Sequence, residues 1–159
     1  MNSFEVVAES LADTAAVGRA LAGQLVPGDA VLLVGDLAAG KTTLVKEVAA
    51  ALGATDTVTS PTFTLAQFYQ SPGGQILHVD TYRLADLTEY RDLGLADYTD
   101  DCVSLIEWGD KVAGEFDAAL TVTLTTEGGQ RRRIRFSATA EHWQPRLVAL
   151  RDAMVGIPA

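Results

Sequence analysis

The sequence predicts an α/β fold, a three-layer sandwich in which a mixed, mainly parallel sheet is extended by β-hairpins. The first observation is a short apolar run, Ala30–Val34, followed by a glycine-rich turn and by helical sequence from Lys41 to about Leu52. Such an unbroken apolar run is typical of a strand buried on both faces of a parallel sheet. Pairs of strand-like segments also flank the turns SPGG and EGGQ, which predicts two hairpins. Strands that alternate with helices around a parallel centre define the α/β class.

The other elements follow in chain order. Ser10 is expected to cap a helix that runs to about Leu25, because apolar residues recur there at helical spacing before PGD interrupts the pattern. The later expected elements are a hairpin of residues 64–70 with 75–83, a short helix over 84–93, an apolar strand at 102–108, a hairpin within 118–139 and a helix from about Ala140 to Met154.

Length and composition indicate a single domain over residues 1–159, with 48% hydrophobic and 21% charged residues. No signal peptide or membrane span is recognisable, so we expect a cytoplasmic protein with no membrane contact. The single cysteine, Cys102, excludes an internal disulfide, and His78 and His142 show no metal-ligand spacing. The net charge of −9 disfavours direct binding of nucleic acid, apart from the arginine run at 131–135. In a nucleic-acid pathway, we would therefore expect protein partners.

The turn after the first predicted strand carries the strongest motif. Gly35 to Thr42 match the pattern G-x-x-x-x-G-K-[ST], the Walker A phosphate loop. Backbone N–H groups of such a loop point at phosphate, Lys41 reaches the β- and γ-phosphates, and the Thr42 hydroxyl ligates Mg²⁺. A chance match is expected in about one sequence of this length per hundred, and the strand–turn–helix context favours function. The expected sandwich is therefore P-loop NTPase-like and binds a nucleoside triphosphate with magnesium.

Hydrolysis needs further groups near the metal. Glu107 ends an apolar strand and Asp80 ends another, where α/β sheets present ligand-binding groups. We expect Glu107, and less firmly Asp80, to share the metal and water-orienting roles, although a lone strand-end carboxylate is more often simply solvated. Thr62, in the sequence SPT, is either a turn residue or a switch that senses the γ-phosphate. Trp108 is either core packing or a nucleotide contact.

Four motifs together, GDLAAGKTT, TSPTFTL, HVDTYRL and LIEWGDK, resemble the TsaE (YjeE) family in order and spacing. The resemblance covers most of the chain, from about Thr14 to the arginine hairpin. It implies a small ATPase, with ATP and Mg²⁺ as cofactors, that is required for the threonylcarbamoyladenosine modification of tRNA. It also implies that the protein binds the complex of the TsaD and TsaB proteins, meets tRNA only indirectly, and uses ATP to reset that complex between turnovers.

The resemblance assigns roles at matching positions. Lys41, Asp80, Glu107 and Thr62 are the expected catalytic residues, with Thr42, Glu107 and Asp80 at the metal. The expected nucleotide contacts are Thr14, Ala38, Ala39, Gly40, Lys41, Thr42, Thr43 and Arg132, and Trp108 joins them as a candidate from its place in the sequence rather than from the resemblance. Arg131 and Arg133 adjoin Arg132, so the contacting arginine is uncertain by one position.

One position departs from the family, which usually has glycine where this chain has Ala38. If the loop requires a positive φ there, alanine costs about 1 kcal/mol; if not, alanine slightly stiffens the loop. Two other functions stay open at this point. One is a small-molecule kinase, for which no acceptor pocket is recognisable, and the other is an assembly factor in which nucleotide binding matters rather than hydrolysis.

Overall fold

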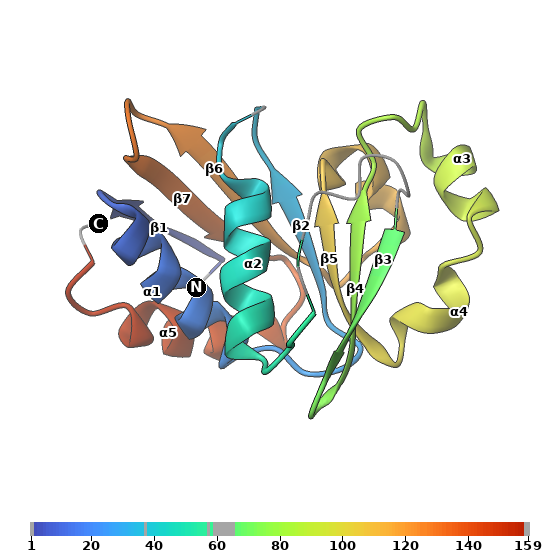
Figure 1. Cartoon of the computed structure of the whole chain (residues 1–159), viewed down its shortest axis with the longest axis horizontal. Helices are drawn as coiled ribbons and strands as arrows, with labels where there is room; N and C mark the ends of the chain where they lie inside the picture. The colour runs from blue at the N-terminus through green and yellow to red at the C-terminus, as the bar shows by residue number, and fades with distance from the viewer. Residues whose placement is uncertain (1, 37, 57, 59–65, 158–159) are drawn as a thin grey trace.

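A computed structural model describes residues 2–36, 38–56, 58 and 66–157. Its strands form one sheet, and its helices flank that sheet (Figure 1). The strands are β1 (Ser3–Ala8), β2 (Ala30–Val34), β3 (Ala66–Ser71), β4 (Gly74–Asp80), β5 (Cys102–Glu107), β6 (Leu120–Thr126) and β7 (Arg132–Ser137). The helices are α1 (Leu11–Ala22), α2 (Lys41–Ala51), α3 (Leu87–Asp92), α4 (Ala96–Thr99), the 3-10 helix η1 (Gly109–Glu115) and α5 (Trp143–Ala153).

The sheet has the strand order β1-β7-β6-β2-β5-β4-β3. Its centre, β6-β2-β5-β4, is parallel, and β3, β7 and β1 are added antiparallel at the two sides. This confirms the expected mixed sheet and both hairpins. Because neighbouring parallel strands end at the same edge, the carboxyl ends of β2, β5 and β4 meet there. Asp80 and Glu107 are direct register partners at that edge.

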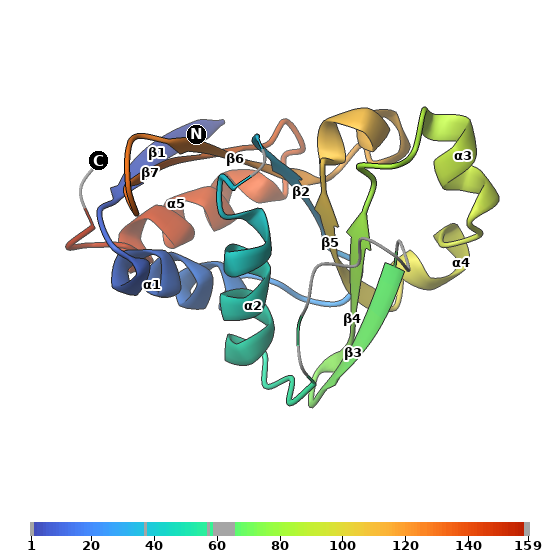
Figure 2. The same ribbon diagram turned by 45° about the horizontal axis from the view of Figure 1, so that its top comes forward.

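Side chains alternate between the two faces of the sheet and form two separate cores. Val31 and Leu33 belong to the larger core, which α1, α2 and α5 cover, whereas Leu32 between them belongs to the smaller one. That smaller core includes residues of α3 and η1 and Leu95, which precedes α4; Figure 2 shows α3 and α4 apart from α1, α2 and α5. The alternation explains the unbroken apolar run of β2, and the two helical layers confirm the three-layer sandwich.

Two glycines permit close approaches that position the site. A Cβ on Gly18 would lie 2.5 Å from the Cβ of Glu47, so α1 packs closely against α2. A Cβ on Gly109 would lie 2.8 Å from the Cα of Leu32, so the chain after β5 crosses directly over β2. Any larger residue at either place would push these elements apart.

The structure adds elements that the sequence did not predict. β1 pairs with β7 along its whole length, and its long-range pairing gives no local turn signal. The short helices α4 and η1 were also missed. Ser10 caps α1 as expected, its side chain accepting from Asp13 N, but the helix ends at Ala22 rather than near Leu25. In the described part of the chain, no helix is long and apolar enough to cross a membrane.

Candidate nucleotide-binding site

The phosphate-loop motif lies between β2 and α2, as predicted. Gly35 has a φ of 155°, and a Cβ there would lie 2.5 Å from the carbonyl oxygen of Leu124, so only glycine fits. Gly40 has a φ of 100° and no side chain caps the first turn of α2. The first N–H groups of that helix are therefore available to an anion, which the helix dipole also favours.

Ala38 has a φ of 65°, in the left-handed region. This resolves the question that its sequence left open: the loop does require positive φ here, and alanine adopts it. Such a conformation costs an L-residue on the order of 1 kcal/mol compared with glycine. Leu37 lies outside the described residues.

Lys41 reaches back over the loop. Its Nζ donates to the carbonyl oxygens of Gly35 at 2.5 Å and Asp36 at 2.9 Å, and lies 3.9 Å from the ring centroid of Trp108. Burial lowers the pKa of Lys41, while the nearby carboxylates of Glu107 and Asp80 act in the opposite direction. The ammonium group is thus held at the mouth of the loop, with an aromatic face beneath it.

Trp108 owes its place to a sharp turn after β5. Its φ of 60° and ψ of 36° are left-handed, and the Thr81 hydroxyl donates to the carbonyl oxygens of both Glu107 (3.0 Å) and Trp108 (2.9 Å). The Tyr82 ring lies 5.1 Å from that of Trp108. A left-handed non-glycine residue held by a buried hydroxyl is a constrained conformation, of the kind that clusters at functional sites.

Glu107 lies at the centre of a buried hydrogen-bonded chain. Its Oε1 accepts from the Thr42 hydroxyl at 2.8 Å, and its Oε2 lies 2.5 Å from Nε2 of His78. His78 is 0% exposed, and its Nδ1 lies 2.8 Å from the hydroxyl of Tyr69. Since Nε2 faces a carboxylate oxygen, it carries a proton and donates it. Both carboxylate oxygens are thereby fixed, one by α2 and the other by β4.

Asp80 is close to that chain. It is 6% exposed, and its Oδ1 accepts from the backbone N–H of Tyr82 at 2.9 Å. His78 and Asp80 are two residues apart on β4, so their side chains share one face of the sheet with Glu107, the register partner of Asp80. The two predicted carboxylates are therefore brought to the same side of the loop.

Arg132, rather than either neighbour, contacts the loop. Its Nε donates to Ala39 O at 2.9 Å and its Nη2 to Ala38 O at 3.2 Å. Arg133 turns away and pairs with Glu5 and Glu127 on the surface; the hydrogen bond that Arg133 donates to Glu127 is the main cause that raises the pKa of its guanidinium. Because residues alternate along β7, the two side chains point to opposite faces, and Arg132 is the one of the two that contacts the loop.

These groups enclose a cavity of about 340 Å³ at the carboxyl edge of the sheet. It is lined by Ala38, Gly40, Lys41, Thr42, Thr43, Asp80, Tyr82, Glu107, Trp108 and Arg132. All except Tyr82 were candidates from the sequence. Two other candidates lie outside this lining: Ala39 is 1% exposed in the core, and Thr14 is 3% exposed, with its hydroxyl donating to Ser10 O at 3.4 Å. Thr62 lies outside the described residues.

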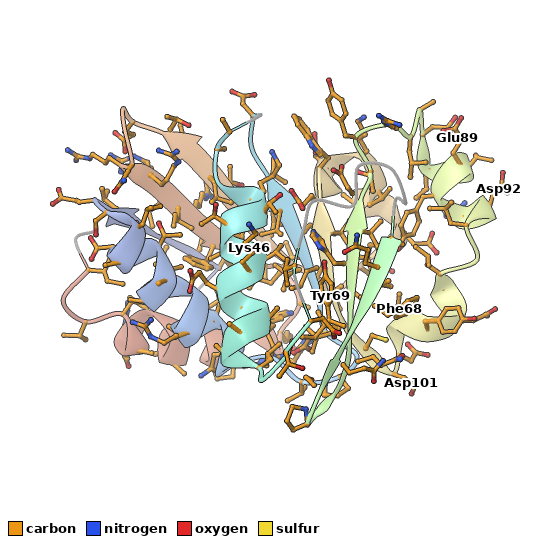
Figure 3. The ribbon with its side chains drawn as sticks, in the orientation of Figure 1. Lys46, Phe68, Tyr69, Glu89, Asp92 and Asp101 are labelled. Carbon is orange, nitrogen blue, oxygen red and sulfur yellow. The ribbon has the colours of Figure 1, made fainter. Side chains whose placement is uncertain are left out.

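Sequence reasoning missed His78, Tyr69 and Tyr82. The signal for His78 was the two-residue spacing to Asp80 within a strand, which places both side chains on one face. Nothing local indicated Tyr69, which is 2% exposed on β3, while its neighbour Phe68 points to the other side of the sheet (Figure 3). The partner of His78 is set by strand pairing alone.

The site combines a strand, a glycine-rich loop and a helix N-terminus. A lysine, a hydroxyl and strand-end carboxylates surround one cavity. This arrangement defines a phosphate-loop nucleotide-binding protein. The family model described as "Threonylcarbamoyl adenosine biosynthesis protein TsaE" matches residues 8–134. The chain belongs to the TsaE family.

Individual relatives of this chain support the same family. The tRNA threonylcarbamoyladenosine biosynthesis protein TsaE of Treponema pallidum is 40% identical over 132 residues, covering 80% of this chain and 96% of that protein. The Bacillus subtilis protein of the same name is 36% identical over 134 residues, covering 83% and 84%. A crystal structure of Bacillus subtilis YdiB has a TM-score of 0.75 at 29% identity and covers 96% of this chain and 93% of that one.

Proposed function

We propose that this protein binds ATP with Mg²⁺ and hydrolyses it in support of threonylcarbamoyladenosine synthesis on tRNA. One observation supports the chemistry most strongly: Lys41, Thr42 and Glu107 converge on the cavity at the N-terminus of α2. The pathway is the one named for the relatives of this chain. The cytoplasmic location expected from the sequence belongs to the same proposal.

The residues present fit a triphosphate. Positive φ at Ala38 and Gly40 shapes the loop, the uncapped start of α2 offers N–H donors, and Lys41 supplies positive charge at the cavity mouth. Arg132 holds the loop by donating hydrogen bonds to two carbonyl oxygens of the loop. A phosphate group at this position would meet fixed donors, so little reorganisation would accompany binding.

The donor set also fits magnesium. Among the described residues, no group of three or more His, Cys, Asp and Glu could hold a metal ion. Mg²⁺ in nucleotide sites needs fewer protein ligands, because phosphate oxygens and waters complete its octahedron. The Thr42 hydroxyl and the Glu107 carboxylate, 2.8 Å apart, would be those ligands, with Asp80 beside them. The ion would neutralise charge that develops on the phosphates.

Within this scheme, the chain's own groups have distinct tasks. Thr42 and Glu107 would hold the metal, and His78 keeps the Glu107 carboxylate from rotating because it holds Oε2. Asp80 orients the water that attacks the terminal phosphate, and Thr14 and Trp108 contribute to binding of the nucleotide. Thr62 acts as the switch. Turnover depends on the carboxylates, whereas binding depends on the loop and Lys41.

The partners belong to the same proposal. A net charge of −9 disfavours direct contact with tRNA, so the protein acts on the complex of TsaD and TsaB and reaches tRNA only through it. ATP hydrolysis would return that complex to its active state after each turnover.

Reconstitution tests this function. Purified TsaD and TsaB with tRNA and carbamoyl donor should make the modification over many turnovers only when this protein and ATP are added. Glu107→Gln should still bind ATP but lose multiple turnover, while Glu141→Gln, the same change at an exposed residue, should behave as wild type. Equal modification rates without this protein would refute its role in the pathway. Transfer of phosphate to a small acceptor would instead establish a kinase.

A further inference from the structure

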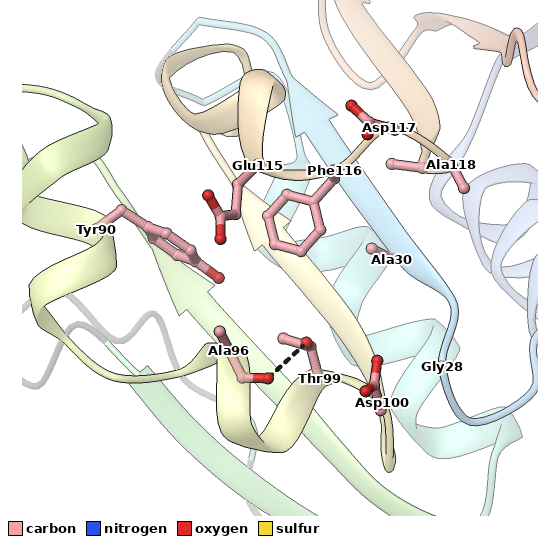
Figure 4. A pocket seen from close by; sticks show the side chains of 11 residues that line it. Gly28, Ala30, Tyr90, Ala96, Thr99, Asp100, Glu115, Phe116, Asp117 and Ala118 are labelled. Carbon is pink, nitrogen blue, oxygen red and sulfur yellow. Dashed lines mark hydrogen bonds between the residues drawn. The ribbon is translucent and has the colours of Figure 1, made fainter.

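A second cavity lies on the other face of the sheet. Its volume is about 270 Å³, and its walls come from the loop before β2, from α3 and α4, and from residues 115–119 after η1 (Figure 4). None of its lining residues belongs to the nucleotide cavity. The volume is below that of most drug-sized ligand sites, so it suits a small group or a single side chain.

The Tyr90 side chain makes this cavity unusual. Tyr90 is 2% exposed, its ring packs edge-on against Phe116 with centroids 5.9 Å apart, and its hydroxyl points into the cavity (Figure 4). That hydroxyl has no hydrogen-bond partner among the described residues. Burial, and then the charge of Glu115, raise the pKa of Tyr90 to about 12. The group is therefore neutral at physiological pH and both donates and accepts.

A second buried hydroxyl lies on β5, the strand beside β2. Ser104 is 0% exposed, and its Oγ has no partner within the described part of the chain. Ser104 is the register partner of Ala30, a lining residue of the cavity, but does not line the cavity itself. Since buried polar groups are nearly always hydrogen-bonded, the Tyr90 hydroxyl inside the cavity, which has no described partner, indicates a place for a polar group from outside the fold.

The charge of the lining defines that group. Asp100, Glu115 and Asp117 line the cavity, and its lining contains no Lys or Arg. Glu115 pairs with Arg91 at 2.8 Å, while Asp100 and Asp117 have no ion pair among the described residues. The apolar part of the wall is the Phe116 ring and several alanines. A ligand must therefore offer positive charge, several N–H donors and a short apolar stem.

A guanidinium group meets these requirements. It has five donors in one plane, it is always charged, and it stacks on aromatic rings. An ammonium offers fewer donors, all from one atom, and could not reach separate acceptors on α3, α4 and the segment after η1. We propose that this cavity binds an alkylguanidinium group, carried by a free small molecule or by an arginine side chain of a protein partner. The site is independent of the proposed ATPase function.

Titration of the full-length protein, followed by amide NMR shifts, tests the site. Agmatine serves as the free cation and N-acetylarginine amide as the peptide-borne side chain. Either should saturate, with a dissociation constant on the order of 1 mM, and shift the amides of Gly28, Ala30 and Ala118. Tighter binding of agmatine assigns the site to a small molecule, and tighter binding of the arginine amide assigns it to a protein partner.

Variants and a neutral ligand complete the test. Asp117→Asn should weaken binding at least about fivefold, whereas Asp97→Asn, the same charge change on an exposed α4 residue that does not line the cavity, should leave it unchanged. Tyr90→Phe should weaken binding about fivefold. The proposal is wrong if the shifts do not saturate, if uncharged butylurea binds equally well, or if Asp117→Asn and Asp97→Asn have the same effect.

Discussion

The two cavities of this protein are similar in volume, about 340 Å³ and 270 Å³, but differ in how their polar groups are held. At the phosphate loop, Lys41, Thr42 and Glu107 each bond to another part of the chain. At the second cavity, the hydroxyl of Tyr90 has no partner among the described residues.

This difference has a structural origin. The first cavity lies at the edge where parallel strands end, and α2 and β4 bring polar side chains there from both sides. The second lies where short helices meet over one face of the sheet, and no described group pairs with the Tyr90 hydroxyl there. A site whose groups already hold one another needs little reorganisation to bind.

Replacing Lys41 should have the largest effect. Lys41→Ala removes the positive charge at the mouth of the loop, and we expect ATP affinity to fall at least about 100-fold. Lys46→Ala, at an exposed lysine of the same helix (Figure 3), is the control and should bind normally. Isothermal titration calorimetry measures both; comparable affinities for the two variants would show that the cavity does not bind phosphate through Lys41.

Removal of His78 should destabilise the fold. His78→Ala leaves Glu107 and Tyr69 without their shared partner in a buried place, so the free energy of unfolding should fall by about 3 kcal/mol. Tyr69→Phe removes the hydroxyl that contacts His78 and Gln67 but keeps the contact between His78 and Glu107, and should cost about 1 kcal/mol. Urea denaturation measures both values. If His78→Ala lowers the free energy of unfolding by less than Tyr69→Phe does, His78 does not hold Glu107.

Arg132 and Arg133 provide a matched pair on one strand. Arg132→Ala removes two hydrogen bonds to loop carbonyls, and we expect nucleotide affinity to fall about tenfold. Arg133→Ala, which affects only surface pairs with Glu5 and Glu127, should leave affinity unchanged. Fluorescent-nucleotide titration compares the two; the reverse order would assign the nucleotide contact to Arg133.

Replacing Ser104 should raise the free energy of unfolding, whereas replacing His78 should lower it. Ser104→Ala removes a buried hydroxyl without a described partner, so the free energy of unfolding should rise by about 1 kcal/mol. Thr42→Ala, which removes a hydroxyl that donates to Glu107, should lower it by a similar amount. Thermal and urea unfolding measure the change in stability of both variants. Destabilisation by Ser104→Ala would show that the Ser104 hydroxyl has a hydrogen-bond partner.

The smallest effect is expected at Ala38, one of two adjacent alanines in the loop. At Ala38, with its φ of 65°, glycine relieves backbone strain but increases the entropy of the unfolded chain, so Ala38→Gly should stabilise by about 0.5 kcal/mol. Ala39 is buried and has no positive φ, and Ala39→Gly should destabilise by about 1 kcal/mol. Equal effects of the two changes would mean that Ala38 is not strained.

Much of the fold was predictable because its signals are local. The apolar run of β2, the glycine turns of both hairpins and the serine cap of α1 each act within a few residues. β1 was not predictable in this way, because its partner β7 lies more than 120 residues away. The layer of α3, α4 and η1 was only partly predicted, since its short helices owe their form to the core beneath them.

The phosphate loop and the chemical groups around it can be identified from the sequence, because strand, turn and helix are contiguous and their spacing is fixed by backbone geometry. Only the folded chain shows that His78 holds Glu107 across 29 residues and that Arg132 reaches the loop across 93. Folding also places the Tyr90 hydroxyl, which has no partner among the described residues, in a second cavity. These contacts depend on strand register and chain crossings, where a shift of one residue would turn each side chain to the opposite face.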